Sequence, residues 1–315
     1  MSPLNLIIDT DNGLGGPLNL FPPKGNLFDV DDGLAIVLAI KSRKITVQGI
    51  TTVFGVSNPK DSFRVTSNLL KILKRDDIPV IEGARSEKDF GKKNHATDFI
   101  INQILKSDNE ISLCTLGPLT NIATAFKLEP RILKRIRKVA IMGSILPINN
   151  IISRFFPTEF NFNLDITSAE YVLKRLQEEG IPTIISDMNL CLQVTFSDKQ
   201  IGILKGVNNE LANFILNGVK DFYYFNKGIN PLKRGFTPWD PICIASLIDK
   251  SLFSTKFFWT ALKKIRIGGL FKLGGLIDIL RKKPKEFKTP IEFCTSIDAE
   301  RFLKMLLSAL IGNKV

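Results

Sequence analysis

The sequence predicts an α/β fold with a largely parallel, Rossmann-like central sheet and helices on both faces. Six short β-rich runs alternate with segments of helical spacing, which is the pattern of such sheets. A length of 315 residues and a hydrophobic fraction of 44% are enough to build the core that such a sheet needs. We therefore expect a single domain over residues 1–315, with an insert at about residues 14–28.

The expected strands are apolar runs bounded by turn or polar residues. They are LNLIID (4–9), ITVQGITTVF (45–54), IPVI (78–81), ISLCTL (111–116), VAIMG (139–143) and IPTIIS (181–186). Strands of a parallel sheet bind ligands at their carboxyl ends. The segments that follow these runs are therefore where we expect the chemistry.

The expected helices fill the intervals between the strands, because their apolar residues recur at three and four positions. They are DDGLAIVLAIKS (31–42), DSFRVTSNLLKILK (61–74), ATDFIINQILK (96–106), LTNIATAFK (119–127) and SAEYVLKRLQEEG (168–180). The last of them ends on a predicted C-cap glycine, Gly180. Beyond Phe196 the pattern turns helical, and a glycine-punctuated segment (265–280) precedes a last helix at 298–310.

Charge and cysteine usage exclude some classes of protein. The net charge of +12 comes from scattered lysines, and the densest basic run (281–288) is broken by a proline and a glutamate, so we expect no nucleic-acid partner. The four cysteines form no pair or cluster with metal-ligand spacing and are expected to be reduced and buried. No apolar run approaches the roughly 20 residues of a membrane span, and no signal-peptide pattern is seen. We expect a cytoplasmic protein without membrane contact.

Five aspartates gather at the end of the first expected strand. They lie in DTDNG (9–13) and DVDDGLAI (29–36), on either side of a glycine- and proline-rich insert: Asp9, Asp11, Asp29, Asp31 and Asp32. Carboxylates so close together repel one another unless a cation lies among them, and all-oxygen ligation suits Ca²⁺ or Mg²⁺. The alternative is that the first pair ends a strand and the second pair caps a helix.

At these residues the sequence resembles the nucleoside hydrolases, the calcium-dependent N-ribohydrolases, although here the aspartate signature is split by the insert. Further segments resemble that family in the same order along the chain. They are GITTVFG (49–55), IPVIEGA (78–84), TLGPLTNIATA (115–125), VAIMGS (139–144), TEFNFNLD (158–165) and WDPICIASLI (239–248). The resemblance implies the family's fold, a homodimer or homotetramer, and hydrolysis of ribonucleosides to free base and ribose.

The resemblance also implies roles for individual residues. Ca²⁺ would be held by the side chains of Asp11, Asp32 and Asp240 and by the main-chain carbonyl of Leu116, with Asp11 as the general base. Asp31, Glu159 and Asn161 would bind the ribose. Asp9 would orient the cluster without binding the metal directly.

Two features depart from the family pattern. One branch of the family has a histidine before the last metal aspartate, but this chain has Trp239, which resembles a purine-preferring branch that stacks the base. The only histidine, His95, stands ahead of an expected helix and is read as a surface or cap residue, with a catalytic acid as the alternative. Where the family commonly has a sugar-binding asparagine this chain has Val56, with Asn58 two positions later.

Two other functions remain open at this point. A phosphatase of the haloacid dehalogenase type would also place a DxD sequence after an apolar strand, with Asp9 as the nucleophile and Mg²⁺ bound. A relative that binds nucleosides or ribose without efficient catalysis would keep the metal cluster. The favoured reading is a purine-leaning nucleoside hydrolase.

Overall fold

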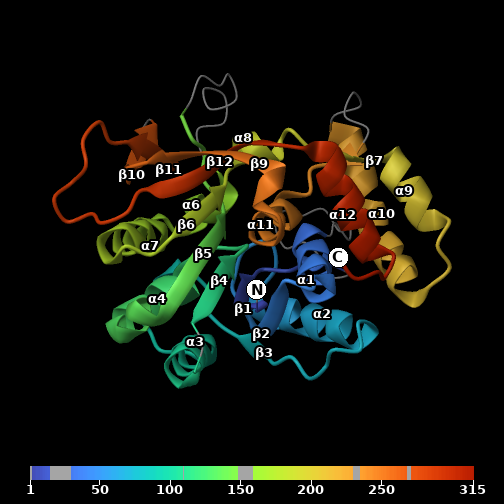
Figure 1. The fold of residues 1–315 in the computed structure, drawn as a ribbon, viewed down its shortest axis with the longest axis horizontal. Helices are drawn as coiled ribbons and strands as arrows, with labels where there is room; N and C mark the ends of the chain where they lie inside the picture. The colour runs from blue at the N-terminus through green and yellow to red at the C-terminus, as the bar shows by residue number, and fades with distance from the viewer. Residues whose placement is uncertain (1, 15–29, 109, 148–158, 230–234, 268–270) are drawn as a thin grey trace.

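The fold is built on an eight-stranded sheet, seen in a computed structural model that describes residues 2–14, 30–108, 110–147, 159–229, 235–267 and 271–315 (Figure 1). In spatial order the strands are β3 (Val80–Glu82), β2 (Ile45–Thr52), β1 (Leu4–Thr10), β4 (Ile111–Thr115), β5 (Ile136–Met142), β6 (Thr183–Ser186), β12 (Ile291–Ile297) and β9 (Phe253–Phe258). All neighbours pair in parallel except β12 with β9. The predicted α/β fold with a largely parallel sheet is confirmed.

Helices cover both faces of this sheet, as predicted (Figure 1). One core cluster joins the sheet to α1 (Asp31–Lys41), α2 (Pro59–Ile72), α8 (Met188–Cys191), α9 (Asp198–Lys205), α10 (Glu210–Ile229), α11 (Trp239–Ile248) and α12 (Ala299–Leu310). The second cluster joins it to α3 (His95–Lys106), α4 (Thr120–Leu128), α6 (Phe160–Leu164) and α7 (Ile166–Glu179). We call these two sides the α1 face and the α4 face.

Side chains of β1 alternate between the two faces, because successive residues of a strand point to opposite sides. Leu6 and Ile8 pack in the cluster of the α1 face, whereas Ile7 packs in that of the α4 face. The same alternation in β4 sends Cys114 to the α1 face and Leu113 to the α4 face. β1 thus lies between two cores, near the middle of the sheet.

The C-terminal part of the chain contributes more strand than the sequence indicated. β12 and β9 extend the main sheet. Two separate two-stranded sheets are formed by β10 (Thr260–Ile267) with β11 (Phe271–Ile279) and by β7 (Phe196–Ser197) with β8 (Gly235–Phe236). The glycine-punctuated segment is therefore largely the β10–β11 hairpin. Residues 15–29, which include most of the predicted insert and Asp29, lie outside the described residues.

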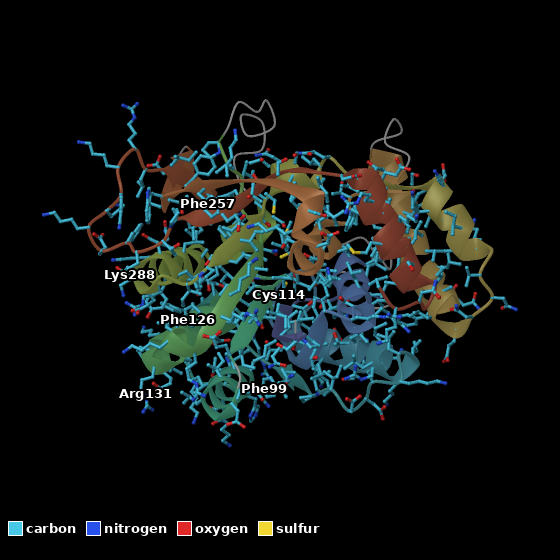
Figure 2. All side chains as sticks on the ribbon, viewed as in Figure 1. Phe99, Cys114, Phe126, Arg131, Phe257 and Lys288 are labelled. Carbon is cyan, nitrogen blue, oxygen red and sulfur yellow. The ribbon has the colours of Figure 1, made fainter. Side chains whose placement is uncertain are left out.

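The four cysteines are free and buried, as expected. Cys114 lies in the interior (Figure 2), and its Sγ is 3.7 Å from the Sγ of Cys243 in α11. Burial raises the pKa of the Cys191 and Cys243 thiols, so both stay protonated near neutral pH. In the part of the chain that the structure describes, no helix combines the length and apolar composition needed to cross a bilayer.

Gly180 and Gly202 have opposite backbone requirements, which predicts opposite effects of the same substitution. Gly180 ends α7 with φ +79°, where a side chain costs about 1 kcal/mol or more, whereas Gly202 lies inside α9 with nothing within 4 Å of an added Cβ. We expect Gly180→Ala to lower the free energy of unfolding and Gly202→Ala to raise it, each by about 1 kcal/mol. Urea denaturation of both variants would check this, and changes of equal sign would contradict it.

Candidate active site

The end of β1 sends polar side chains to both faces of the sheet. Thr10 continues the even positions toward the α1 face, where its Oγ1 donates a hydrogen bond to Asp32 Oδ1. Asp9 continues the odd positions toward the α4 face, where its Oδ1 accepts from Asn121 of α4 at 2.9 Å. The middle residue of the DTD sequence therefore supports an aspartate of α1. The sequence analysis did not single it out, although strand alternation was the available signal.

Three carboxylates meet on the α1 face. Asp31 and Asp32 begin α1, Asp240 lies in the first turn of α11, and ligand oxygens of all three lie within 4.8 Å of one another. All three residues are buried, and the Asp240 N–H donates to Asp31 Oδ2 at 3.4 Å. The positive ends of two helix dipoles offset part of the repulsion between these charges. We call this group the acidic trio.

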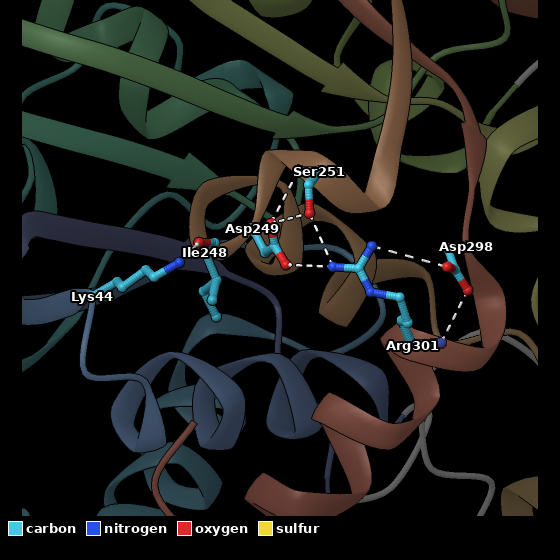
Figure 3. Close-up of polar contacts among 6 residues, drawn as sticks. All are labelled: Lys44, Ile248, Asp249, Ser251, Asp298 and Arg301. Atoms are coloured by element: carbon cyan, nitrogen blue, oxygen red, sulfur yellow. Dashed lines mark hydrogen bonds and ion pairs between the residues drawn. The ribbon is translucent and has the colours of Figure 1, made fainter.

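Helix α11, which carries Asp240, is also anchored at its opposite end (Figure 3). The Ile248 carbonyl accepts from Lys44 Nζ at 2.9 Å, and Asp249 Oδ2 accepts from Arg301 Nη2 of α12 at 3.1 Å. Arg301 Nη2 also donates to Ser251 Oγ at 2.9 Å. Hydrogen bonds from Ser251 hold the pKa of Asp249 below its usual value, with help from the nearby Arg301 charge. Asp240 of the trio is thus carried by a helix that Lys44, directly before β2, and Arg301 of α12 hold at its C-terminal end.

Asp11 follows Thr10 in the chain and is not one of the three members of the trio. Its Oδ2 accepts from the Val56 N–H at 2.6 Å, and its side chain packs between two glycines. A Cβ on Gly55 would overlap Asp11 Oδ2, and one on Gly117 would lie 2.7 Å from Oδ1. Glycines at these two positions are therefore what allows the carboxylate to lie against the turns after β2 and β4. Of the predicted side-chain ligands, the structure brings Asp32 and Asp240 together and places Asp11 next to Leu116–Gly117.

Asp9 belongs to a different network from the trio. Its Oδ1 accepts from Thr51 Oγ1 at 2.5 Å and from Asn121 Nδ2 at 2.9 Å, and the residue is 1% exposed. Burial raises the pKa of Asp9 to about 7, while the hydrogen bonds from Thr51 and Asn121 oppose that shift. Its carbonyl accepts from the Leu116 N–H at 2.8 Å. The placement agrees with a supporting role.

Two of the three predicted sugar-binding residues, Glu159 and Asn161, lie across the carboxyl ends of β4 and β5, whereas Asp31 belongs to the acidic trio. The Asn161 amide donates to the Leu116 carbonyl at 2.7 Å and to the Met142 carbonyl at 3.3 Å. Glu159 caps α6, accepting from Asn161 N at 2.7 Å, and also accepts from Ser144 N at 2.9 Å. Burial raises the pKa of Glu159, against the effect of these backbone donors. Asn161 therefore contacts the carbonyl that was predicted to bind the metal.

Asp187 is a buried carboxylate that the sequence analysis missed. It follows β6 and caps α8, accepting from Leu190 N at 3.0 Å and from Leu146 N at 2.8 Å. Asn189 supports it through Nδ2, which donates to the Leu146 carbonyl and to Asp187 Oδ2, both at 2.9 Å. Burial raises the pKa of Asp187 to about 6, despite these donors. Asp187 and Glu159 thus hold the same short segment after β5, in which Ser144 has a left-handed φ of +74°.

The positions that depart from the family pattern are also placed by the structure. Asn58 caps α2, where its side-chain oxygen accepts from Asp61 N at 2.9 Å. Trp239 is half-buried at the start of α11, directly before Asp240. His95 is exposed at the first position of α3, as the surface reading predicted.

A cavity of about 630 Å³ lies at the end of β3 and the start of α3. Its wall comes from residues between Glu82 and Asp98, and it includes His95 but no member of the acidic trio. Asn121 reaches this wall, accepting from Ala84 N at 2.9 Å. The same amide that holds Asp9 therefore contacts the cavity wall.

The donor set of the acidic trio fits a hard divalent cation. Three carboxylates offer only oxygen, which suits Ca²⁺ or Mg²⁺ better than zinc or copper. A cation among them would remove the mutual repulsion of the buried charges. The geometry supports a metal site without indicating which ion it takes.

Comparison with known proteins gives matches over most of the chain. Residues 6–304 match the family described as inosine-uridine preferring nucleoside hydrolase. A pyrimidine-specific ribonucleoside hydrolase (RihA) of Salmonella arizonae is 26% identical over 262 residues, covering 74% of this chain and 81% of the relative.

Solved structures share the whole fold. A plant nucleoside hydrolase superposes with a TM-score of 0.79 at 22% identity, covering 98% of this chain and 99% of the other. A purine-preferring ribonucleoside hydrolase from Gardnerella vaginalis gives a TM-score of 0.78 at 21% identity, covering 98% of both chains. At such identities the superpositions establish the fold alone.

Asp187 predicts a specific pH dependence of stability. Its pKa of about 6 in the folded state lies above the usual 3.8, so the folded state binds the proton more tightly. The contribution of this carboxyl to the free energy of unfolding is therefore largest below pH 4 and falls as the pH rises through 6. From pH 5 to pH 7 the free energy of unfolding of wild type should therefore fall by about 1 kcal/mol relative to that of Asp187→Asn. Urea denaturation at both pH values would measure it, and a constant difference would refute the assignment.

Proposed function

The chain belongs to the inosine-uridine preferring nucleoside hydrolase family, and we propose that its acidic site cleaves ribonucleosides, with a leaning toward purines, to free base and ribose. The observation that carries this proposal is the acidic trio at the carboxyl end of β1. Ligand sites of parallel sheets lie at that edge. Family membership makes the chain a hydrolase of N-glycosidic bonds, so the proposal concerns the metal, the residue roles and the preferred base.

The proposed metal is Ca²⁺, held by Asp11, Asp32 and Asp240 and by the carbonyl of Leu116. When bound, it would lower the pKa of a water ligand and bind ribose hydroxyls. Support comes from the oxygen-only donor set and from Thr10, which holds Asp32 in place. A fixed second partner of this kind is typical of metal ligands.

Asp11 is the proposed general base. Its Oδ2 is fixed by the Val56 N–H, and the glycines on either side leave the carboxylate little freedom to turn. A base held in one orientation can take the proton of the attacking water without first losing rotamer freedom. The carboxylates around it would also stabilise positive charge that develops on the sugar.

The ribose would be bound by Asp31, Glu159 and Asn161. Since the Asn161 amide nitrogen already donates to two carbonyls, a sugar hydroxyl would act as donor to its Oδ1. Glu159 is anchored by three backbone N–H groups, which fix its position at the end of β5. Both residues can therefore recognise the sugar without a large rearrangement of their backbone.

The purine leaning rests on two aromatic side chains. Trp239 is half-buried beside Asp240, and Phe160, between the two sugar-binding residues of α6, is 36% exposed. Aromatic faces at the site would stack on the base, and the larger purine ring offers more area for this. One similar protein is named pyrimidine-specific and another purine-preferring, so similarity alone does not indicate which base this chain prefers.

The other functions considered from the sequence are less well supported. Family membership and the buried, hydrogen-bonded state of Asp9 speak against a haloacid dehalogenase-type phosphatase, which needs an accessible nucleophile at that position. The same membership argues against a purely binding relative. A homodimer or homotetramer in the cytoplasm remains our prediction from the resemblance.

Release of reducing sugar tests the proposed function directly. Inosine, guanosine, adenosine, uridine and cytidine would each be incubated with the protein in Ca²⁺ and after chelation. We expect calcium-dependent release that is faster from the purine nucleosides. Equal or faster release from uridine would contradict the role of the two aromatic residues, and release unaffected by chelation would contradict the metal.

Asp11→Asn tests the general base. The amide keeps the shape of the side chain in its tight position and can still accept from Val56 N, but it cannot take a proton. We expect kcat to fall by roughly 10²- to 10⁴-fold or more, with the melting temperature nearly unchanged. Asp77→Asn, at an exposed ion pair with Arg75, is the matched control. A rate for Asp11→Asn equal to that of the control would rule out the proposed base.

A further inference from the structure

Asn121 joins four segments of the chain through one buried side chain. Its Nδ2 donates to Asp9 Oδ1 at 2.9 Å and to the Thr52 carbonyl at 3.0 Å. Its Oδ1 accepts from Ala84 N at 2.9 Å and lies 3.5 Å from Asn94 Nδ2. Both amide hydrogens and both lone pairs of the carbonyl oxygen are therefore directed at partners.

The first pair of contacts leads to the acidic site. Asp9 is held by only two side-chain donors that the structure describes, Thr51 and Asn121, and both bind the same oxygen. The Asp9 carbonyl accepts from Leu116 N, and the next residue, Thr10, donates to Asp32. The backbone at Asp9 is therefore linked to Leu116, whose carbonyl is a proposed ligand, and to Thr10, which holds Asp32; a displacement of this backbone would be transmitted to both.

The second pair of contacts leads to the cavity wall. Ala84 and Asn94 both line the cavity at the end of β3, and Gly83 between that strand and Ala84 lies directly against the amide. A Cβ on Gly83 would lie 2.5 Å from Asn121 Nδ2 and would clash with the Thr52 carbonyl. The position of this wall is thus set by the same side chain.

We propose that Asn121 is a positioning residue that couples the wall of this cavity to the metal site through Asp9. The inference rests on the proposed function, because it takes the acidic trio to bind Ca²⁺, and it adds that the bound nucleoside reaches this cavity. Asn121 itself contacts neither metal nor substrate. It sets the affinity for both by holding Asp9 on one side and Ala84 on the other.

Three single variants separate the contact of Asn121 with Asp9 from its contacts with the cavity wall. Thr51→Val removes the other donor to Asp9 and leaves the cavity wall untouched. Asn94→Ala removes a wall contact and the cap of α3 but leaves Asp9 untouched. Asn121→Ala removes both sets of contacts. Each variant would be compared with wild type in three measurements. These are calcium affinity by calorimetry without substrate, KM and kcat, and melting temperature without metal.

We expect Asn121→Ala to weaken calcium binding roughly tenfold, at the lower end of the effects of outer-shell partners, and also to raise KM. Thr51→Val should weaken calcium binding without raising KM at saturating calcium. Asn94→Ala should raise KM and lower the melting temperature but leave calcium affinity unchanged.

Unchanged calcium affinity in Asn121→Ala, with a lower melting temperature, would reduce Asn121 to a structural role and overturn the inference. If that variant does not fold, Asn121→Asp keeps the acceptor for Ala84 N but replaces the Nδ2 donor to Asp9 and to the Thr52 carbonyl by an oxygen; it must still weaken calcium binding. A wild type that binds calcium but cleaves no nucleoside would refute the proposed function alone, and the calcium data would then decide the inference. A wild type that binds no calcium would overturn it.

Discussion

The two-residue period of β1 is the constraint on which the site depends. Because successive side chains face opposite sides of the sheet, Asp9 and Thr10 are committed to different cores. Thr10 supports the acidic trio of the α1 face, and Asp9 enters a network with α4. A shift of one residue in the pairing of β1 with β2 and β4 would exchange these two roles. Register and function are therefore fixed together.

The site also concentrates destabilising charge. Ligand oxygens of three buried carboxylates lie within 4.8 Å of one another. Three further acids, Asp9, Glu159 and Asp187, are also buried, and burial raises the pKa of each of these three. Burial of this kind disfavours the ionised forms, and helix N-termini and backbone donors recover only part of the loss. The remainder of the molecule compensates with two extensive apolar cores on either side of the sheet. Groups arranged at this cost to stability are characteristic of functional sites.

Much of this arrangement could be predicted from the sequence, and the remainder could not for physical reasons. Local patterns revealed the six parallel strands and the cap at Gly180, because each depends on a few neighbouring residues. Strands β9 and β12 were not predicted, because polar residues such as Lys256 and Glu292 interrupt their apolar runs and their place beside β6 is set by contacts between distant segments. Asp187 and Asn121 escaped notice because their importance comes from burial and from contacts between distant segments, which spacing does not reveal.

The separation of the trio along the chain has a consequence for how the protein is made. Asp31 and Asp240 are 209 positions apart, and their helices pack directly on each other. During synthesis the N-terminal strands can form before α11 exists, but the group of three carboxylates cannot. Contacts of such long range also form late in folding, since closing a long loop must precede the gain. The three carboxylates can thus come together only after most of the polypeptide has been translated.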